Sequence, residues 1–371
     1  MPSPFTTFIS DWWALAVLAS AGSVLISIIL ILLSRAFDLR NLEQTAKTEF
    51  VFAASTVLIV LFTYGLISVA EGTPESPGVV ITLAKEMYLN AVTYCPPSAS
   101  AVPGSVCDKL SQLKESGVIG LHVNTTADLM LLYMEPPAKC SQEFLDFLYY
   151  ASIPIEACAS LYMEIFMSEQ LTCFGLKWVA ERITNTTQLL TFYMFVYYLI
   201  FHTMNFIKYY AGFFFSVGVI LRAFPPTRGG GAYLMALTVG LYFVFPFAYI
   251  LVSSTSMPYA QASTFSAKDV TSEGVVYTCG IPAISKDVDA LQCGTGSVYK
   301  PFELLSWLKT NREKMNSFFT INIPGLMKHL VAVICIFPMV AFVILMTFVL
   351  NTTNLFGGNI PEIGRGLVRL I

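Results

Sequence analysis

The strongest constraint on this chain is a set of long segments that carry no charged residue and are almost wholly apolar. The first runs from Trp12 to Ser34 and the second from Val51 to Ala70. A helix of about 20 apolar residues spans the roughly 30 Å hydrocarbon core of a bilayer. The apolar part of a signal peptide is shorter and follows a basic segment that this chain lacks. Both segments are therefore predicted to be transmembrane helices, the first an uncleaved anchor.

Three further segments have the same character, at residues 188–207, 232–254 and 329–350. The stretch 209–224 is apolar for too short a distance to cross a bilayer comfortably. It is predicted to continue the third helix or to form a re-entrant or interfacial segment, with a sixth crossing as the alternative. The expected fold class is an all-α polytopic membrane protein with about five transmembrane helices and disulfide-bonded extracytoplasmic loops.

The composition of the chain agrees with this class. Of its 371 residues, 55% are hydrophobic and only 12% are charged, whereas an average soluble domain has about 25% charged residues. A net charge of −3 gives no sign of a protein that coats nucleic acid. The distribution of the charges is more informative than their sum.

Basic residues gather in three short segments, 35–49, 208–231 and the C-terminal tail, and Lys and Arg near membrane spans are retained in the cytoplasm. Five helices with the N-terminus outside and the C-terminus in the cytoplasm place all three segments inside. We therefore expect a multi-pass cell-membrane protein. The predicted parts are a two-helix segment (1–70), an outer cysteine-containing loop domain (71–187), helices three and four with a basic turn (188–254), a second outer loop (255–328), and the fifth helix with its cytoplasmic tail (329–371).

The cysteines fall in the two predicted outer loops, with the exception of Cys335. An oxidising exterior permits disulfides there. Cys279 and Cys293 are predicted to pair, because they are the two cysteines of their loop, and Cys95 is predicted to pair with Cys107. The other cysteines of the first loop are odd in number, so their pairing stays open. The disulfide candidates are Cys95, Cys107, Cys140, Cys158, Cys279 and Cys293.

Other features of the outer loops also yield predictions. Asn124 and Asn185 each begin an Asn-Thr-Thr sequon that an archaeal or eukaryotic host can glycosylate on the exterior. The stretch FLDFLYYASIPIEACASLYMEIF is predicted to form a helical hairpin broken at Pro154. In the second loop, residues 275–300 are predicted to form a disulfide-closed hairpin, and 302–319 an amphipathic helix at the outer interface.

Few polar groups fall within the predicted spans, which contain no Asp, Glu, Lys or Arg. His202 and Asn205 lie three residues apart on one helix face, so they are predicted to line a polar path or to form an interhelical hydrogen bond. Pro246 and Pro338 are predicted to kink the fourth and fifth spans. No nucleotide-binding, metalloprotease or hydrolase motif is present, and the spacing of the cysteines fits no zinc site. A non-enzymatic protein without cofactor or metal is expected.

The most distinctive segment is LRAFPPTRGGGAYLMALTVGLYFVFPFAYIL. Two prolines and three glycines predict a sharp cytoplasmic turn, with arginines at the headgroup boundary on either side. The arginines fit a positive-inside anchor, and the turn also suits docking of a cytoplasmic motor or contact with phosphate. The docking candidates are Arg222, Pro225, Pro226 and Arg228.

This turn, with the C-terminal NLFGGNIPEIGRGLVRLI, resembles a family of archaeal polytopic membrane proteins linked to DNA transfer. The family includes the DNA-import membrane component of the crenarchaeal exchange-of-DNA system. It is itself regarded as similar to the polytopic inner-membrane subunit of bacterial type IV secretion and conjugation machines. That bacterial subunit has five spans, an outside N-terminus, a large outer loop after the second span and an inside C-terminus, which is the topology predicted above.

The resemblance implies a multi-copy membrane platform, a homo-oligomer at the base of a DNA-conducting pore. Its implied partners are small pilin-like membrane subunits and a cytoplasmic hexameric ATPase, with DNA as the transported substrate. No catalytic residue is implied. The alternative functions are a stand-alone solute transporter or channel, and a membrane-anchored surface receptor or adhesin.

Overall fold

The structure is a computed structural model that describes residues 13–37, 40–72, 78–93, 125–159, 162–165, 168–171, 174–224, 227–260, 265–271, 274–279, 320–321 and 323–356. Helices dominate these residues. They are α2 (Trp13–Ala36), α3 (Arg40–Glu71), α4 (Val79–Thr93), α6 (Thr126–Ala159), α7 (Phe174–Ala223), α8 (Arg228–Val239), α9 (Phe245–Ala260), α13 (Ile323–Leu330) and α14 (Phe337–Leu355), with π-helical turns η4 (Gly240–Val244) and η6 (Val331–Ile336). The strands are β1 (Tyr162–Ile165), β2 (Ser168–Leu171), β3 (Phe265–Thr271) and β4 (Gly274–Cys279).

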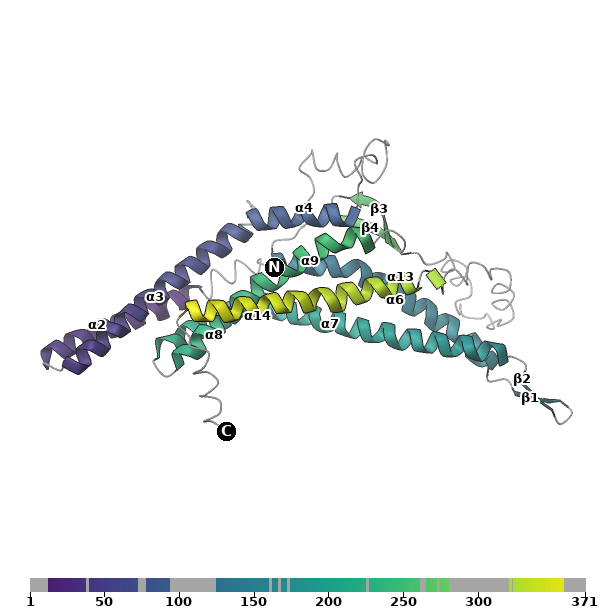
Figure 1. Ribbon diagram of the computed structural model, residues 1–371, viewed down its shortest axis with the longest axis horizontal. Helices are drawn as coiled ribbons and strands as arrows, with labels where there is room; N and C mark the ends of the chain where they lie inside the picture. The colour runs from purple at the N-terminus through teal and green to yellow at the C-terminus, as the bar shows by residue number, and fades with distance from the viewer. Residues whose placement is uncertain are drawn as a thin grey trace, which may run out of the picture.

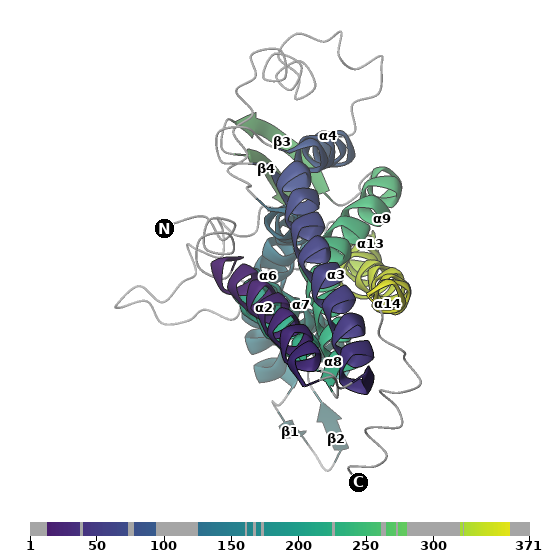
Figure 2. The same ribbon diagram turned by 90° about the vertical axis from the view of Figure 1, so that its left-hand side faces the viewer.

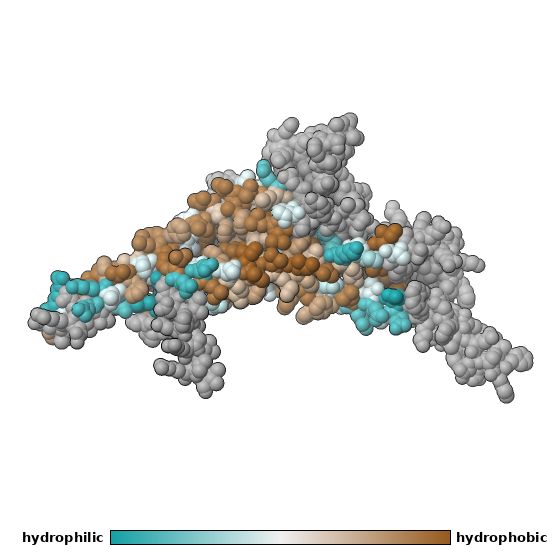
Figure 3. Space-filling model, viewed as in Figure 1, coloured by the Kyte–Doolittle hydropathy of each residue, from teal (hydrophilic) through white to brown (hydrophobic). Residues whose placement is uncertain are grey.

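Five helical segments of the described chain are long and apolar enough to cross a membrane, which confirms the predicted membrane class. They are Ala16–Ala36, Ala46–Glu71, Ala180–Ala223, Arg228–Thr255 and Ile323–Leu355. The helices lie along one elongated bundle (Figures 1 and 2). Apolar side chains gather over the middle of the visible face, and hydrophilic side chains lie toward its two ends (Figure 3).

The third segment is one helix rather than a short span followed by a separate piece. Helix α7 has 50 residues, a length of about 75 Å at the usual rise of an α-helix. Residues 209–223 therefore continue the third helix, as predicted. The expected domain boundary at residue 187 falls inside α7. Because a hydrocarbon core is only about 30 Å thick, part of α7 extends beyond it or the helix is strongly tilted.

The first predicted outer loop contributes a long helix to the bundle. Helix α6 continues through Pro154 to Ala159, so the predicted helical hairpin broken at that proline is wrong. The reversal comes later and is a β-hairpin, in which β1 pairs with β2. Packing against neighbouring helices can compensate for the hydrogen bond that a proline removes. Side chains of α6 form one buried core with α4, α7, α9, α13 and α14, including Met130, Phe144 and Tyr249.

The second predicted outer loop is described only in part. The segment VVYTC forms β4, which pairs with the preceding strand β3 in antiparallel register, Phe265 opposite Cys279. The two strands are joined by a short connection, so this hairpin has a low entropic cost. The segment CGTGSVYK lies outside the described residues, and the disulfide-closed hairpin stays a prediction.

Irregular helix geometry accompanies both prolines that were predicted to kink spans. The π-helical turn η4 ends two residues before Pro246, and η6 ends two residues before Pro338. A proline removes one backbone donor and crowds the preceding turn. A π-helical turn is wider than an α-helical one and gives room for that disruption. Whether the two spans are kinked stays a prediction.

Glycines permit the close crossing of α7 and α8. A Cβ atom added at Gly231 would lie 2.5 Å from the backbone nitrogen of Arg222 and 2.6 Å from the carbonyl oxygen of Gly218. At Gly240, an added Cβ would lie 2.6 Å from the side chain of Leu345 on α14. Gly231 therefore permits the close approach of α7 and α8, and Gly240 permits that of η4 and α14.

We expect Gly231→Ala to lower the free energy of unfolding by about 1–3 kcal/mol, because its methyl group meets backbone atoms that cannot move independently. Gly230→Ala is the matched control, since an added Cβ there has no atom within 4 Å. It should leave stability unchanged or slightly raise it, because alanine favours helix. Thermal unfolding in detergent measures both, and equal midpoints for the two variants would contradict the tight crossing.

Candidate functional site

The described residues contain a buried polar cluster where four helical elements meet, here called the Glu71 junction. Its members are Glu71, Thr126, Asp128, Lys208 and Tyr242. Glu71 is the last residue of α3 and is only 3% exposed. Thr126 and Asp128 belong to the first turn of α6, Lys208 to the middle of α7, and Tyr242 to η4.

The Glu71 carboxylate accepts hydrogen bonds from two sides. Its Oε1 atom accepts from the backbone nitrogen of Thr126 at 3.3 Å and from the Thr126 hydroxyl at 3.2 Å. Its Oε2 atom accepts from the Tyr242 hydroxyl at 2.9 Å. A carboxylate beside the N-terminus of a helix also interacts favourably with the positive end of the helix dipole. Burial of this charge is thus balanced by three donors and a helix terminus.

The start of α6 is fixed by its own capping interactions. The Thr125 hydroxyl donates to Oδ2 of Asp128 at 2.8 Å and accepts from the Asp128 backbone nitrogen at 3.2 Å. This is the geometry of an N-terminal cap, which satisfies donors that a helix terminus leaves unpaired. Oδ1 of Asp128 then binds Nζ of Lys208 at 2.5 Å. The junction therefore joins α3, α6, α7 and η4 through one connected set of polar contacts.

The chemistry of the Glu71 junction is that of a closed structural site. All three groups that contact the Glu71 carboxylate are donors, so they leave no converging oxygen ligands for a cation. Asp128 is already paired with Lys208. The described residues hold no group of three His, Cys, Asp or Glu side chains placed to bind a metal ion. The arrangement can hold helices together but shows no catalytic constellation.

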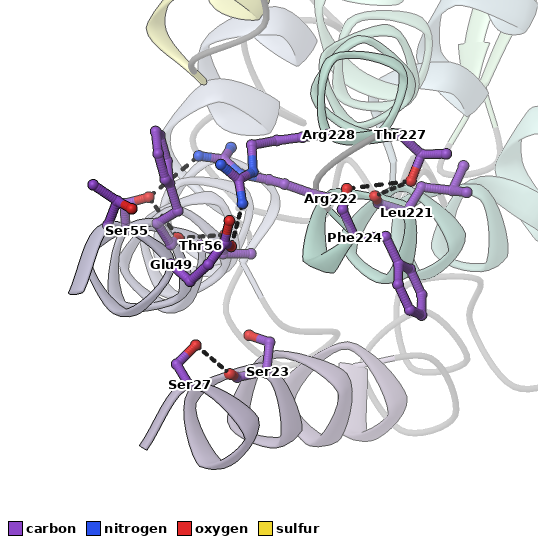
Figure 4. A network of polar contacts seen from close by, with 12 residues as sticks. Ser23, Ser27, Glu49, Ser55, Thr56, Leu221, Arg222, Phe224, Thr227 and Arg228 are labelled. Atoms are coloured by element: carbon purple, nitrogen blue, oxygen red, sulfur yellow. Dashed lines mark hydrogen bonds and ion pairs between the residues drawn. The ribbon is translucent and has the colours of Figure 1, made fainter. Parts of the chain in front are cut away.

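The apolar side chains over the middle of the bundle are here called the apolar belt. A second polar group lies at the end of this belt opposite the Glu71 junction and is called the arginine cluster. It consists of Arg222 and Arg228 with Glu49 and Ser55 of α3 (Figure 4), together with Phe52 of the same helix. Arg228 forms an ion pair with Glu49, and its guanidinium carbon lies 4.1 Å from the ring centroid of Phe52. This contact is a cation–π interaction. Arg222 and Arg228 of the predicted basic segment 208–231 therefore meet Glu49 and Ser55 of α3 at one end of the bundle. Lys208, the first basic residue of that segment, lies instead at the Glu71 junction, so the predicted grouping of all three basic residues at one end is wrong.

Arg222 is the less satisfied of the two arginines. It is only 4% exposed. Its Nη2 atom donates to the Ser55 hydroxyl at 3.3 Å, and its guanidinium carbon lies 5.9 Å from the Phe356 ring centroid. The Nε and Nη1 atoms are buried without a hydrogen-bond partner. Among the described residues, Glu49 is the one carboxylate that forms an ion pair with either arginine.

The structure thus places the predicted docking arginines against α3 rather than on a free surface. Pro225 and Pro226 lie outside the described residues. Phe224 and Thr227, on either side of them, are exposed. The Thr227 hydroxyl donates to the Leu221 carbonyl oxygen at 2.7 Å and helps to close the turn. A docking role for this turn stays a prediction.

The structure shows the surroundings of His202 and Asn205 within the described residues, where neither side chain forms a hydrogen bond across helices, so the predicted interhelical bond stays a prediction. His202 is exposed on α7, and its ring stacks on Tyr198 with centroids 6.5 Å apart and meets Phe201 edge-on at 5.5 Å. These neighbours belong to the same helix. Asn205 is half-buried. Whether this face lines a polar path stays a prediction.

The predicted disulfides and glycosylation sites are only partly covered. Cys95, Cys107, Cys293 and Asn124 lie outside the described residues, as does the amphipathic segment 302–319. Cys140 is buried in α6, Cys158 lies near the end of that helix, and Cys279 ends β4. Asn185 is exposed on α7, which is compatible with modification. The pairings and the glycosylation stay predictions.

Sequence reasoning missed the Glu71 junction because its members are scattered over more than 170 positions. Two features of the sequence relate to single members of the junction. Glu71 directly follows a charge-free run, and Thr125 stands three residues before Asp128, which is the spacing of a helix-capping pair. Neither feature shows which distant residue contacts Glu71 or Asp128. Comparison of the chain with family models, curated proteins and solved structures gave no match.

We expect Glu71→Ala to lower the free energy of unfolding by about 2–3 kcal/mol, because it removes the buried carboxylate that accepts hydrogen bonds from the Thr126 amide, the Thr126 hydroxyl and the Tyr242 hydroxyl. Glu71→Gln should cost less, since its amide oxygen still accepts. Exposed Glu143 on the same bundle is the control, and Glu143→Ala should change stability by less than about 0.5 kcal/mol. A Glu71→Ala midpoint equal to that of the control in detergent unfolding would contradict the junction.

Proposed function

We propose that this protein is a non-enzymatic membrane subunit of a DNA-transfer apparatus similar to type IV secretion systems. The support is the resemblance carried by residues 221–251, read together with where those residues lie. The turn joins α7 to α8, its Gly231 permits their close crossing, and Gly240 packs on α14. The segment that carries the resemblance therefore includes a turn at one end of the bundle and helices that pack closely within it.

The single observation on which the proposal depends most is the assembly of a basic end. Arg228 is tied to Glu49, and Arg222 to Ser55, so the turn and the 35–49 segment form one unit at the end of the apolar belt. With the N-terminus outside and the C-terminus in the cytoplasm, this unit faces the cytoplasm. The exposed turn at Phe224 and Thr227 then presents a fixed surface to a cytoplasmic ATPase.

In this proposal the outer half of the chain lies on the exterior. Helix α6 and the N-terminal half of α7 pack together there and provide a rigid surface for small pilin-like subunits. Disulfides among the outer cysteines would strengthen the segments that connect these helices. Several copies of the chain would surround the path of the DNA.

A stand-alone transporter is the second candidate, and one observation favours it. Charged groups buried among membrane helices often mark the path of an ion or substrate, and the Asp128–Lys208 pair lies in the bundle with side chains 24% and 12% exposed. However, Glu71 and Asp128 are both occupied by partners within the chain. Because the junction offers no open ligand position, the DNA-transfer proposal accounts better for a closed, rigid bundle.

Deletion of the gene in its host should abolish exchange of chromosomal DNA between marked strains, and complementation should restore it. Arg228→Glu should bring transfer close to the deletion level, because it places two carboxylates side by side. Arg228→Glu combined with Glu49→Arg should recover transfer, since the pair is restored with reversed charges. Exchange at the wild-type frequency in the deletion strain would overturn the proposal, and a defect limited to solute uptake or adhesion would support the alternatives.

The orientation has its own test. Intact cells carrying Thr227→Cys should not react with a membrane-impermeant maleimide, whereas permeabilised cells should. Ser263→Cys, in the second outer loop, should react in intact cells. Labelling of the parent chain without either substitution sets the background. The reverse pattern would place the basic turn outside and would contradict five crossings with an external N-terminus.

A further inference from the structure

We propose that the arginine cluster binds the phosphate group of an anionic phospholipid. The inference requires insertion in a membrane and does not depend on the proposed role in DNA transfer. It starts from charge: two guanidinium groups share one described carboxylate, that of Glu49. The described part of the cluster therefore carries one excess positive charge.

The excess charge is concentrated on Arg222. This residue is almost wholly buried, with only 4% of its surface exposed. Two of its three nitrogens lack a hydrogen-bond partner, and the third has only the 3.3 Å contact with the Ser55 hydroxyl. A buried guanidinium without an anion is strongly unfavourable. An arginine fork matches the oxygens of a phosphate geometrically, so phosphate is a fitting partner.

The position of the cluster indicates a lipid rather than a solute. Arg228 and Glu49 stand where the apolar stretch of α3 begins, and basic side chains at that level meet the headgroups of a bilayer. Large apolar side chains flank the arginines and remain exposed, among them Phe52, Phe224 and Leu355. Lipid acyl chains would cover these groups, whereas a free phosphate ion would leave them in water.

The lipid headgroup reaches the arginine cluster from the side of Arg228. Its side chain is 16% exposed, whereas the unpartnered nitrogens of Arg222 are closed off by their surroundings. The headgroup therefore meets Arg228 first. Arg222 then exchanges its long contact with Ser55 for the phosphate by turning about its terminal side-chain bonds. Phe356, at the end of α14, lies over Arg222 and must shift with it.

The test is thermal unfolding of the purified full chain in mild detergent with added lipid. Wild-type protein should be stabilised by phosphatidylglycerol and much less by phosphatidylcholine or inorganic phosphate. Arg222→Gln should bind phosphatidylglycerol at least about tenfold more weakly, since one charge-assisted contact is lost. Arg182→Gln, at an exposed arginine nearer the start of α7, should respond as the wild type does.

The lipid-free baseline separates binding from a structural role. Without lipid, Arg222→Gln should be as stable as the wild type or more stable, because it removes an uncompensated buried charge. With phosphatidylglycerol the order should reverse. If Arg222→Gln fails to fold, Arg222→Lys keeps the charge but loses the fork, and it should give an intermediate affinity. An undiminished lipid response in both variants, or an equal response of the wild type to inorganic phosphate, would overturn the proposal.

Discussion

The arrangement of the bundle depends on the burial of the Glu71 carboxylate. A charged group in a low-dielectric interior is tolerated only when donors surround it, and here they come from the first turn of α6 and from Tyr242. Helix α6 must therefore begin where α3 ends. The capping pair Thr125 and Asp128 fixes that start, and Asp128 extends the connection to Lys208 on α7.

This constraint explains why a segment that follows the second span belongs to the bundle. From the junction, α6 runs beside the N-terminal half of α7, and α9 and α13 pack against the same core. The great length of α7 follows from this arrangement, because one helix packs both against α6 and against α2, α3 and α8. The part of the bundle built on α6 is thus continuous with the helices that are long and apolar enough to cross a membrane.

The membrane class and the five long helices could be predicted from the sequence. The length of an apolar segment is a local property of the sequence, and the thickness of a bilayer sets the length that a spanning helix needs. Contacts between distant residues could not be predicted. Pro154 was expected to end a helix, yet tertiary packing carries α6 past it. Glu71 gave no sign in the sequence that Thr126 and Tyr242 would be its partners.

The two polar groups at either end of the apolar belt differ in one respect that bears on function. At the Glu71 junction every charge has an internal partner, so this end is complete within a single chain. At the arginine cluster, two nitrogens of Arg222 have none. Stability alone would favour an apolar residue at that position. The retention of a guanidinium there is explained if its partner comes from outside the chain, and the phosphate headgroups of a bilayer supply anions at that level.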